Sequence, residues 1–198
     1  MSENTTIWNP WHVCTKVSPG CKNCYMFRRD SKYGIDSTLV HKTKSFRMPV
    51  QKDRHKNYKV PRGSTVYTCF TLDFFHKDAD EWRPDAWAMI RERSDCHFYM
   101  VTKRPERIAA ALPSEGCPKN VTIVCTCENQ YWTDKRLPVF VALPLPHKEI
   151  IHEPMLSSIH IRNVGPHSRW LDSQFFGDPA FHIRQTFILL HQFFNRTR

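Results

Sequence analysis

The order of apolar and polar residues after position 63 follows two alternating patterns. Runs rich in β-branched and aromatic residues, typical of buried strands, occur at 65–71, 97–102, 121–126 and 149–152. Between them, apolar residues recur at helical spacing over about 80–94, 105–111 and 129–137. Strands that alternate with helices at this pitch predict a parallel sheet. The fold class is therefore α/β, either an open doubly wound sheet or a partial (β/α) barrel with parallel strands.

The segments before and after this region follow the pattern less closely. A short helix is expected over 25–33, and a long polar connection over 36–63 includes one expected strand at 45–48. Near the carboxyl end, apolar residues at helical spacing predict an amphipathic helix over 181–194. A chain of this length can bury one sizeable core, so we expect a single domain over residues 1–198.

Three cysteines lie close together near the amino end, in the spacing Cys-x6-Cys-x2-Cys. They are Cys14, Cys21 and Cys24, and a turn signal at 18–20 precedes the second of them. Iron and zinc bind such residues as thiolates. A structural zinc site takes four protein ligands, whereas a four-iron cluster held by three cysteines leaves one iron open. The triplet therefore indicates a [4Fe-4S] cluster.

Two other interpretations of the triplet stay open. Zinc is the first, with His12 or a distant residue as the fourth ligand. Buried thiols that act as small apolar residues are the second. Cys125 and Cys127 share one face of a predicted strand, and we interpret them as buried core residues rather than a second metal site. Cys69, Cys96 and Cys117 are isolated and are assigned to the core or the surface.

Polar residues follow the ends of all four predicted strands. In parallel α/β folds ligands bind at the carboxyl ends of strands, because the loops converge there. Taken singly, each such residue is more often a helix cap or a surface charge. Taken together they predict a cofactor-binding site lined by Asp73, Lys103, Glu128, Asn129 and Glu153.

The charge and the cysteine content indicate which class of partner and which cellular compartment to expect. A formal charge of +10 favours an anionic partner such as nucleic acid or a nucleotide, although the basic run at 47–59 is also typical of a solvated loop. The sequence has no apolar run of membrane-spanning length and no signal-peptide pattern, and its eight cysteines are bunched. We therefore expect a cytoplasmic protein, and in that reducing compartment bunched cysteines indicate metal. The oligomeric state is not predicted.

Several blocks of the sequence, in order, resemble a family of phage and bacterial proteins of undetermined function. The blocks share aromatic, cysteine and strand-end residues and lie at Trp8–Pro10, Cys14–Tyr25, Asp73–His76, Asp80–Trp82, Thr102–Arg107, Cys127–Gln130, Arg136–Pro138 and His152–Leu156, with a weaker one at Ile183–Gln185. The likeness extends from about Trp8 to Ile161.

The resemblance implies a radical-SAM-like protein with a full or partial β/α barrel. In such proteins three cysteines, here Cys14, Cys21 and Cys24, hold a [4Fe-4S] cluster, and S-adenosylmethionine chelates the open iron. The reduced cluster then cleaves the sulfonium to give a deoxyadenosyl radical. The usual first gap between the cysteines is three residues, and the gap of six found here is shared by the family that the chain resembles.

One segment departs from that family. Its members carry Gly-Gly-Glu-Ser-Gly on the strand after the Glu-Pro block, where this chain has Val164–Arg169. We therefore interpret residues 162–198 as a diverged or truncated part of the domain. The alternatives to a radical enzyme are an inactive family member and a non-enzymatic, zinc-stabilised module that binds nucleic acid.

Overall fold

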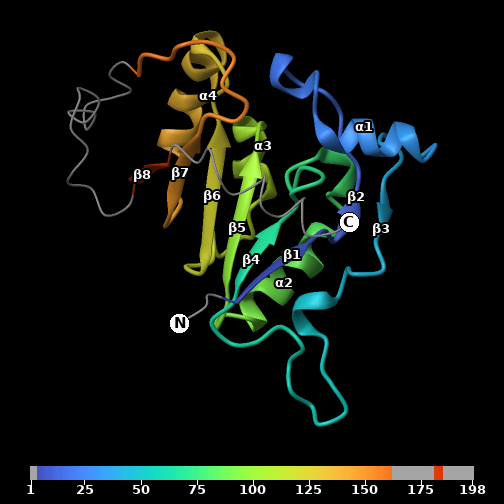
Figure 1. Cartoon of the computed structure of the whole chain (residues 1–198). Coiled ribbons are helices and arrows are strands. Elements are labelled where there is room, and N and C mark those ends of the chain that lie inside the picture. The colour runs from blue at the N-terminus through green and yellow to red at the C-terminus, as the bar shows by residue number, and fades with distance from the viewer. Residues whose placement is uncertain (1–3, 162–180, 185–198) are drawn as a thin grey trace.

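A parallel sheet organises the molecule (Figure 1). The computed structural model describes residues 4–161 and 181–184. Within them, six strands pair in the order β1-β4-β5-β6-β7-β8, and every neighbouring pair is parallel. The strands are β1 (Thr5–Trp8), β4 (Thr65–Thr68), β5 (His97–Thr102), β6 (Val121–Thr126), β7 (Lys148–Ile151) and β8 (Phe181–Arg184).

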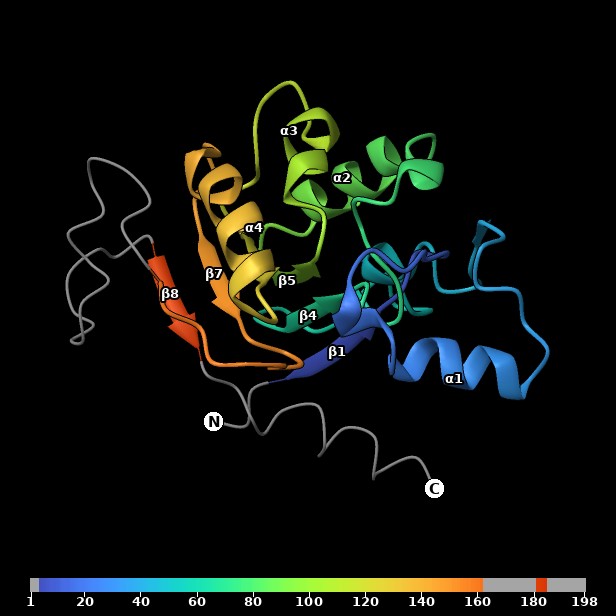
Figure 2. The same ribbon diagram turned by 90° about the horizontal axis from the view of Figure 1, so that it is seen from above.

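The helices that connect these strands lie on one side of the sheet. Figure 2 shows α2 (Arg83–Glu92), α3 (Pro105–Ala111) and α4 (Gln130–Ala142) together above the strands, and α1 (Tyr25–Lys32) apart from them. Because the strand order follows the chain and crossovers between parallel strands share one hand, successive connections return over the same face. The loops at the carboxyl ends of the strands therefore gather at one edge of the sheet.

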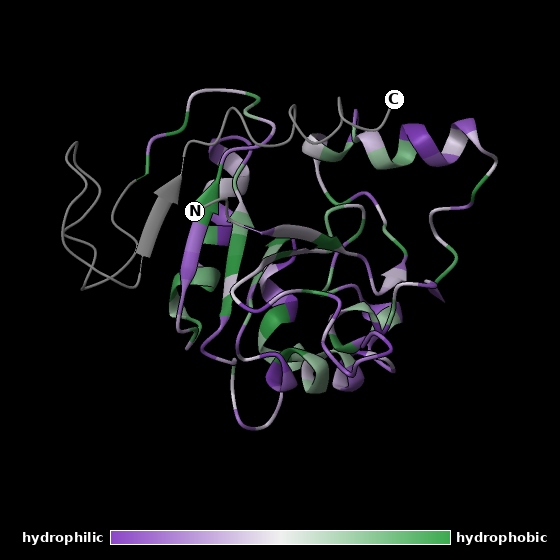
Figure 3. Ribbon diagram, turned by 60° about the horizontal axis from the view of Figure 1, so that its bottom comes forward, coloured by the Kyte–Doolittle hydropathy of each residue, from purple (hydrophilic) through white to green (hydrophobic). Residues whose placement is uncertain are grey.

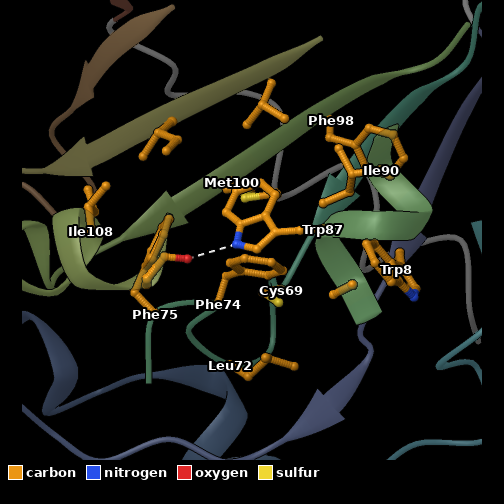
Figure 4. Close-up of a cluster of buried hydrophobic side chains, with 14 of the residues drawn as sticks. Trp8, Cys69, Leu72, Phe74, Phe75, Trp87, Ile90, Phe98, Met100 and Ile108 are labelled. Atoms are coloured by element: carbon orange, nitrogen blue, oxygen red, sulfur yellow. Dashed lines mark hydrogen bonds between the residues drawn. The ribbon is translucent and has the colours of Figure 1, made fainter. Parts of the chain in front are cut away.

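The main core lies between the sheet and these helices. Alternate residues of neighbouring strands, including Val66, Phe98 and Met100, are fully buried on the helix-covered side. Trp87 of α2 packs against Phe74 with ring centroids 4.9 Å apart. Its indole Nε1 donates a hydrogen bond of 2.8 Å to the Ala111 carbonyl, so α2 and α3 are joined inside the core (Figure 4).

A smaller substructure holds α1 beside the sheet. Here β2 (Trp11–His12) and β3 (His41–Lys42) form an antiparallel pair. Asp30 of α1 is fully buried, accepts a hydrogen bond from Ser37 and pairs with His12 Nε2 at 2.7 Å. Figure 3 shows α1 turning from partly hydrophobic at its start to hydrophilic towards its end, and its buried residues are Met26 and Asp30.

The 3-10 turns are η1 (Pro19–Cys21), η2 (Met48–Val50) and η3 (Lys77–Ala79). The predicted parallel α/β fold is confirmed, and the ranges predicted for β5, α3 and β6 coincide with the structure. The predicted strand at 45–48 is wrong. That segment is a turn leading into η2, because Pro49 has no amide to donate to a neighbouring strand.

The amphipathic helix predicted over 181–194 is also wrong for its first four residues. Residues 181–184 form β8, which pairs with β7, and the remainder of that range lies outside the described residues, as does 164–169. The helix predicted over 129–137 continues through Pro138 to Ala142. No helix in the described part of the chain is long and apolar enough to cross a membrane.

Candidate functional site

The three cysteines lie on one loop, residues 14–24, which we call the thiol loop. Its second half is the tight turn that the sequence predicts: Cys21 ends η1, and the Cys21 amide donates to the Ser18 carbonyl at 2.9 Å. Cys24 is the residue before α1, and its amide donates to the Cys21 carbonyl at 3.3 Å. The turn and the start of a helix thus fix the close pair of thiols.

A cavity of about 560 Å³ brings most of the predicted site residues together. All three thiols line it, as do Asp73, Lys103 and Glu153 from the carboxyl ends of three strands. All eight cysteines of the chain are free thiols. Within the described residues, no group of three or more Cys, His, Asp or Glu side chains is arranged so that it can hold a single metal ion.

Cys14 is the thiol most affected by its surroundings. Burial, and then the Asp73 carboxylate, raise the pKa of Cys14 to about 12, while the Arg104 guanidinium opposes the shift. At neutral pH the metal-free side chain is therefore a neutral thiol. Metal binding releases the proton of such a thiol, so a bound cation is what would make Cys14 a thiolate.

A buried ion pair joins the thiol loop to the sheet. Arg104 Nη1 donates to Asp73 Oδ2 at 2.8 Å, and Arg104 Nη2 donates to the Thr15 carbonyl at 2.8 Å. Asp73 also accepts from the Thr102 hydroxyl at 2.9 Å and from the Phe75 amide at 3.0 Å. Because Thr15 follows Cys14, the position of the first thiol depends on this pair.

Glu128 supports the loop from the other side but does not line the cavity. It is fully buried and pairs with Arg136 of α4, which also donates to the Thr126 carbonyl at 2.8 Å. A Cβ on Gly20 would lie 3.2 Å from the Glu128 Oε1 and Cδ atoms, so the loop backbone rests directly on this carboxylate. Glu128 Oε1 has no hydrogen-bond partner among the described residues.

Asn129 has a structural contact outside the cavity lining. Its Oδ1 accepts a 3.0 Å hydrogen bond from the Trp132 amide and caps α4. The predicted role of Glu128 and Asn129 in cofactor binding therefore stays a prediction. His12, one of the candidates for the fourth ligand in the alternative zinc site, is engaged with Asp30 through Nε2.

The part of the cavity below the thiols is formed by the sheet face opposite α2, α3 and α4. Among the residues that line it, five carry a ring or a charge, and we call these five the sheet floor: Tyr67, Phe70, His97, Tyr99 and Glu149. Tyr67 and Tyr99 are register partners with ring centroids 5.6 Å apart, and the Tyr99 hydroxyl donates to Glu149 at 2.7 Å. Burial lowers the pKa of His97, with the charge of His147 acting in the same direction.

Comparison with protein-family models identifies the family of this chain. The model described as "Protein of unknown function (DUF5131)" matches residues 2–171. The chain belongs to the DUF5131 family. Comparisons with curated proteins and with solved structures gave no match. The DUF5131 description names no activity, so the chemistry has to be argued from the cavity.

The sequence prediction missed several residues of this DUF5131 site. Arg104, the residue after Lys103, was not among the predicted site residues, and its buried pairing with Asp73 was not expected. Cys69, predicted to lie in the core or at the surface, is buried and also lines the cavity. Tyr67 and Tyr99 lie inside strands rather than at their ends, and the signal for them was the alternation of polar or aromatic residues with apolar ones. Cys125 and Cys127 are fully buried in the core, as expected.

Proposed function

We propose that this chain is an iron–sulfur protein in which Cys14, Cys21 and Cys24 hold a [4Fe-4S] cluster and S-adenosylmethionine is used for radical chemistry. The observation that carries the proposal is that three thiols of one loop line one cavity together with Asp73 and other polar residues from the carboxyl ends of parallel strands.

The number of thiols fits a cluster better than a structural zinc site. Such a zinc site takes four protein ligands, and His12, one candidate for the fourth, is engaged with Asp30. A four-iron cluster can be held by three cysteines alone. Three thiols of one loop around a shared cavity suit that arrangement, and they leave one iron for a small molecule.

One buried polar atom of the cavity lining also suits a bound cofactor. Thr126 lines the cavity, and its hydroxyl is fully buried without a hydrogen-bond partner among the described residues. Buried polar groups are normally hydrogen-bonded, and one left alone costs about 1–3 kcal/mol. A polar ligand in the cavity would remove the cost at Thr126.

When bound, the cluster and S-adenosylmethionine together supply a deoxyadenosyl radical. The protein's own side chains would bind and orient S-adenosylmethionine. Lys103 and Glu153 bear opposite charges at the cavity edge, which suits the carboxylate and ammonium groups of the methionine part. Burial raises the pKa of Glu153 and the charge of the Lys103 ammonium opposes that rise, so the two side chains interact electrostatically.

The strand order supports a radical-SAM-like partial barrel. A sheet whose strands follow chain order, with its connecting helices on one side, is the arrangement of part of a β/α barrel. We further propose a cytoplasmic location, since eight free thiols are compatible with a reducing compartment.

Anaerobic reconstitution with iron and sulfide, followed by dithionite and S-adenosylmethionine, tests the function. We expect release of 5'-deoxyadenosine from the wild-type chain and from Cys125→Ala, whose thiol lies in the core. Cys21→Ala should release none. A reconstituted cluster that yields no 5'-deoxyadenosine would refute the radical function.

A further inference from the structure

The cavity extends along the sheet beyond the thiols. Its lining on β5 extends from Lys103, just beyond the carboxyl end of the strand, to His97 at the amino end. Six residues of extended chain span about 20 Å. The thiols lie at the Lys103 end, so the sheet floor forms a second compartment further along the strand.

The chemistry of the sheet floor is that of a site for a planar, hydrogen-bond-donating group. Three aromatic rings lie there, with Tyr67 and Phe70 centroids 5.0 Å apart and Tyr67 and Tyr99 centroids 5.6 Å apart. Glu149 is the one carboxylate among the five floor residues and can only accept hydrogen bonds when ionised. Its Oε2 is positioned by the Tyr99 hydroxyl. Aromatic rings beside a fixed acceptor suit a heterocycle with N–H groups on its edge.

The opposite end of the cavity carries a small excess of positive charge. Arg104 is paired with Asp73 and Lys103 acts on Glu153, and Arg28, an exposed residue of α1, adds a further cation to the lining. The chain as a whole has a formal charge of +10. A ligand matched to both ends is planar and rich in N–H donors at one end and anionic at the other.

We propose that the cavity binds a nucleotide unit, with its base on the sheet floor and its phosphate beside Arg28. This names the substrate class of the proposed radical enzyme and rests on that function for its chemistry, while the binding itself does not need the cluster. The base should carry an exocyclic amine facing Glu149. Uracil should bind least well, because its one N–H lies between two carbonyl oxygens that repel a carboxylate.

Calorimetric titration of the full chain with AMP, CMP, GMP and UMP tests this, with adenosine and a single-stranded oligonucleotide as further arms. We expect the three aminated nucleotides to bind more tightly than UMP. Tyr67→Leu should weaken AMP about 5- to 150-fold, the effect of losing one stacked ring. Tyr67→Phe should retain binding, and Tyr131→Leu, which removes an exposed tyrosine of α4, should have no effect. Glu149→Gln should weaken AMP about tenfold.

The contributions of the base and the phosphate to binding can be measured separately. Arg28→Ala should weaken AMP but not adenosine, and Lys119→Ala, at an exposed position outside the cavity, should change neither. Tighter binding of the oligonucleotide than of AMP would assign the nucleotide unit to a strand, and equal or weaker binding would assign it to free nucleotides. Either result agrees with the proposal.

Three results would overturn the proposal: no binding of any nucleotide or oligonucleotide, equal effects of Tyr67→Leu and Tyr131→Leu, or displacement of AMP by S-adenosylhomocysteine, which would make the floor the adenine site of the cofactor. Cys21→Ala separates the two proposals, because it should lose the cluster and still bind AMP. Nucleotide binding without a cluster in the wild type would refute the iron–sulfur function alone, and a cluster without nucleotide binding would refute the substrate assignment alone.

Discussion

Replacing Arg104 with methionine removes the buried link between the thiol loop and the sheet. Asp73 and Arg104 are 4% and 6% exposed, and their side chains meet at 2.8 Å. Without the guanidinium, the Asp73 carboxylate stays buried with only neutral donors, such as the Thr102 hydroxyl and the Phe75 amide. Breaking a buried pair in this way costs about 3–5 kcal/mol. The variant also loses both hydrogen bonds from Arg104 to Thr15, so it should hold less iron after reconstitution.

Urea unfolding of the metal-free, reduced chain measures this cost, with Arg91→Met as the matched control. Arg91 pairs with Glu115 at 3.8 Å, and both side chains are largely exposed, so its loss should cost under about 1 kcal/mol. Arg104→Lys keeps the charge but not the planar fork that reaches Asp73 and Thr15 together, so its cost should be intermediate. If Arg104→Met lowered the free energy of unfolding no more than Arg91→Met does, the pair would not be the anchor described above.

The other predictions concern the loop and its supports. Gly20→Ala should destabilise the chain by about 1–3 kcal/mol, since its Cβ would lie 3.2 Å from a Glu128 carboxylate held by Arg136, and an unchanged urea midpoint would contradict that packing. Because the folded-state pKa of Cys14 is raised to about 12 from 9.0, the unfolded chain loses this proton first, so the metal-free protein should lose stability as pH rises above 9. The loss from this thiol is about 1 kcal/mol between pH 9 and 10, and Cys14→Ala should remove it; identical pH profiles for the two proteins would be inconsistent with a buried thiol. Asn129→Ala should cost about 1 kcal/mol through the lost cap of α4 while leaving iron content unchanged, and a loss of iron at full helix stability would show that Asn129 acts on the cofactor instead.

The sequence predicted the centre of the sheet better than its edges. β5 and β6 are long enough for their apolar residues to identify them, and Pro105 at the first turn of α3 marks where that helix begins. β1 was not expected, because four residues with one buried side chain give little local signal. Its pairing with β4, far along the chain, decides that it is a strand.

The sequence predicted which loops meet at the cavity better than it predicted the partners of individual side chains. The thiol triplet and the strand-end residues Asp73, Lys103 and Glu153 meet at one cavity because parallel strands deliver their loops to one edge. Glu128 was expected beside them, yet its carboxylate is paired with Arg136 of α4. That pairing joins a strand end to a helix, and no spacing rule within a single element identifies it.

The most direct test of the account is a metal and sulfide count on the anaerobically reconstituted full chain. We predict about four irons and four sulfides per chain and negligible zinc. Cys14→Ala, Cys21→Ala and Cys24→Ala should each lose the cluster, and Cys125→Ala, at a fully buried core position, should retain it. One zinc with no sulfide, or a cluster that survives in all three loop variants, would contradict the assignment of these thiols.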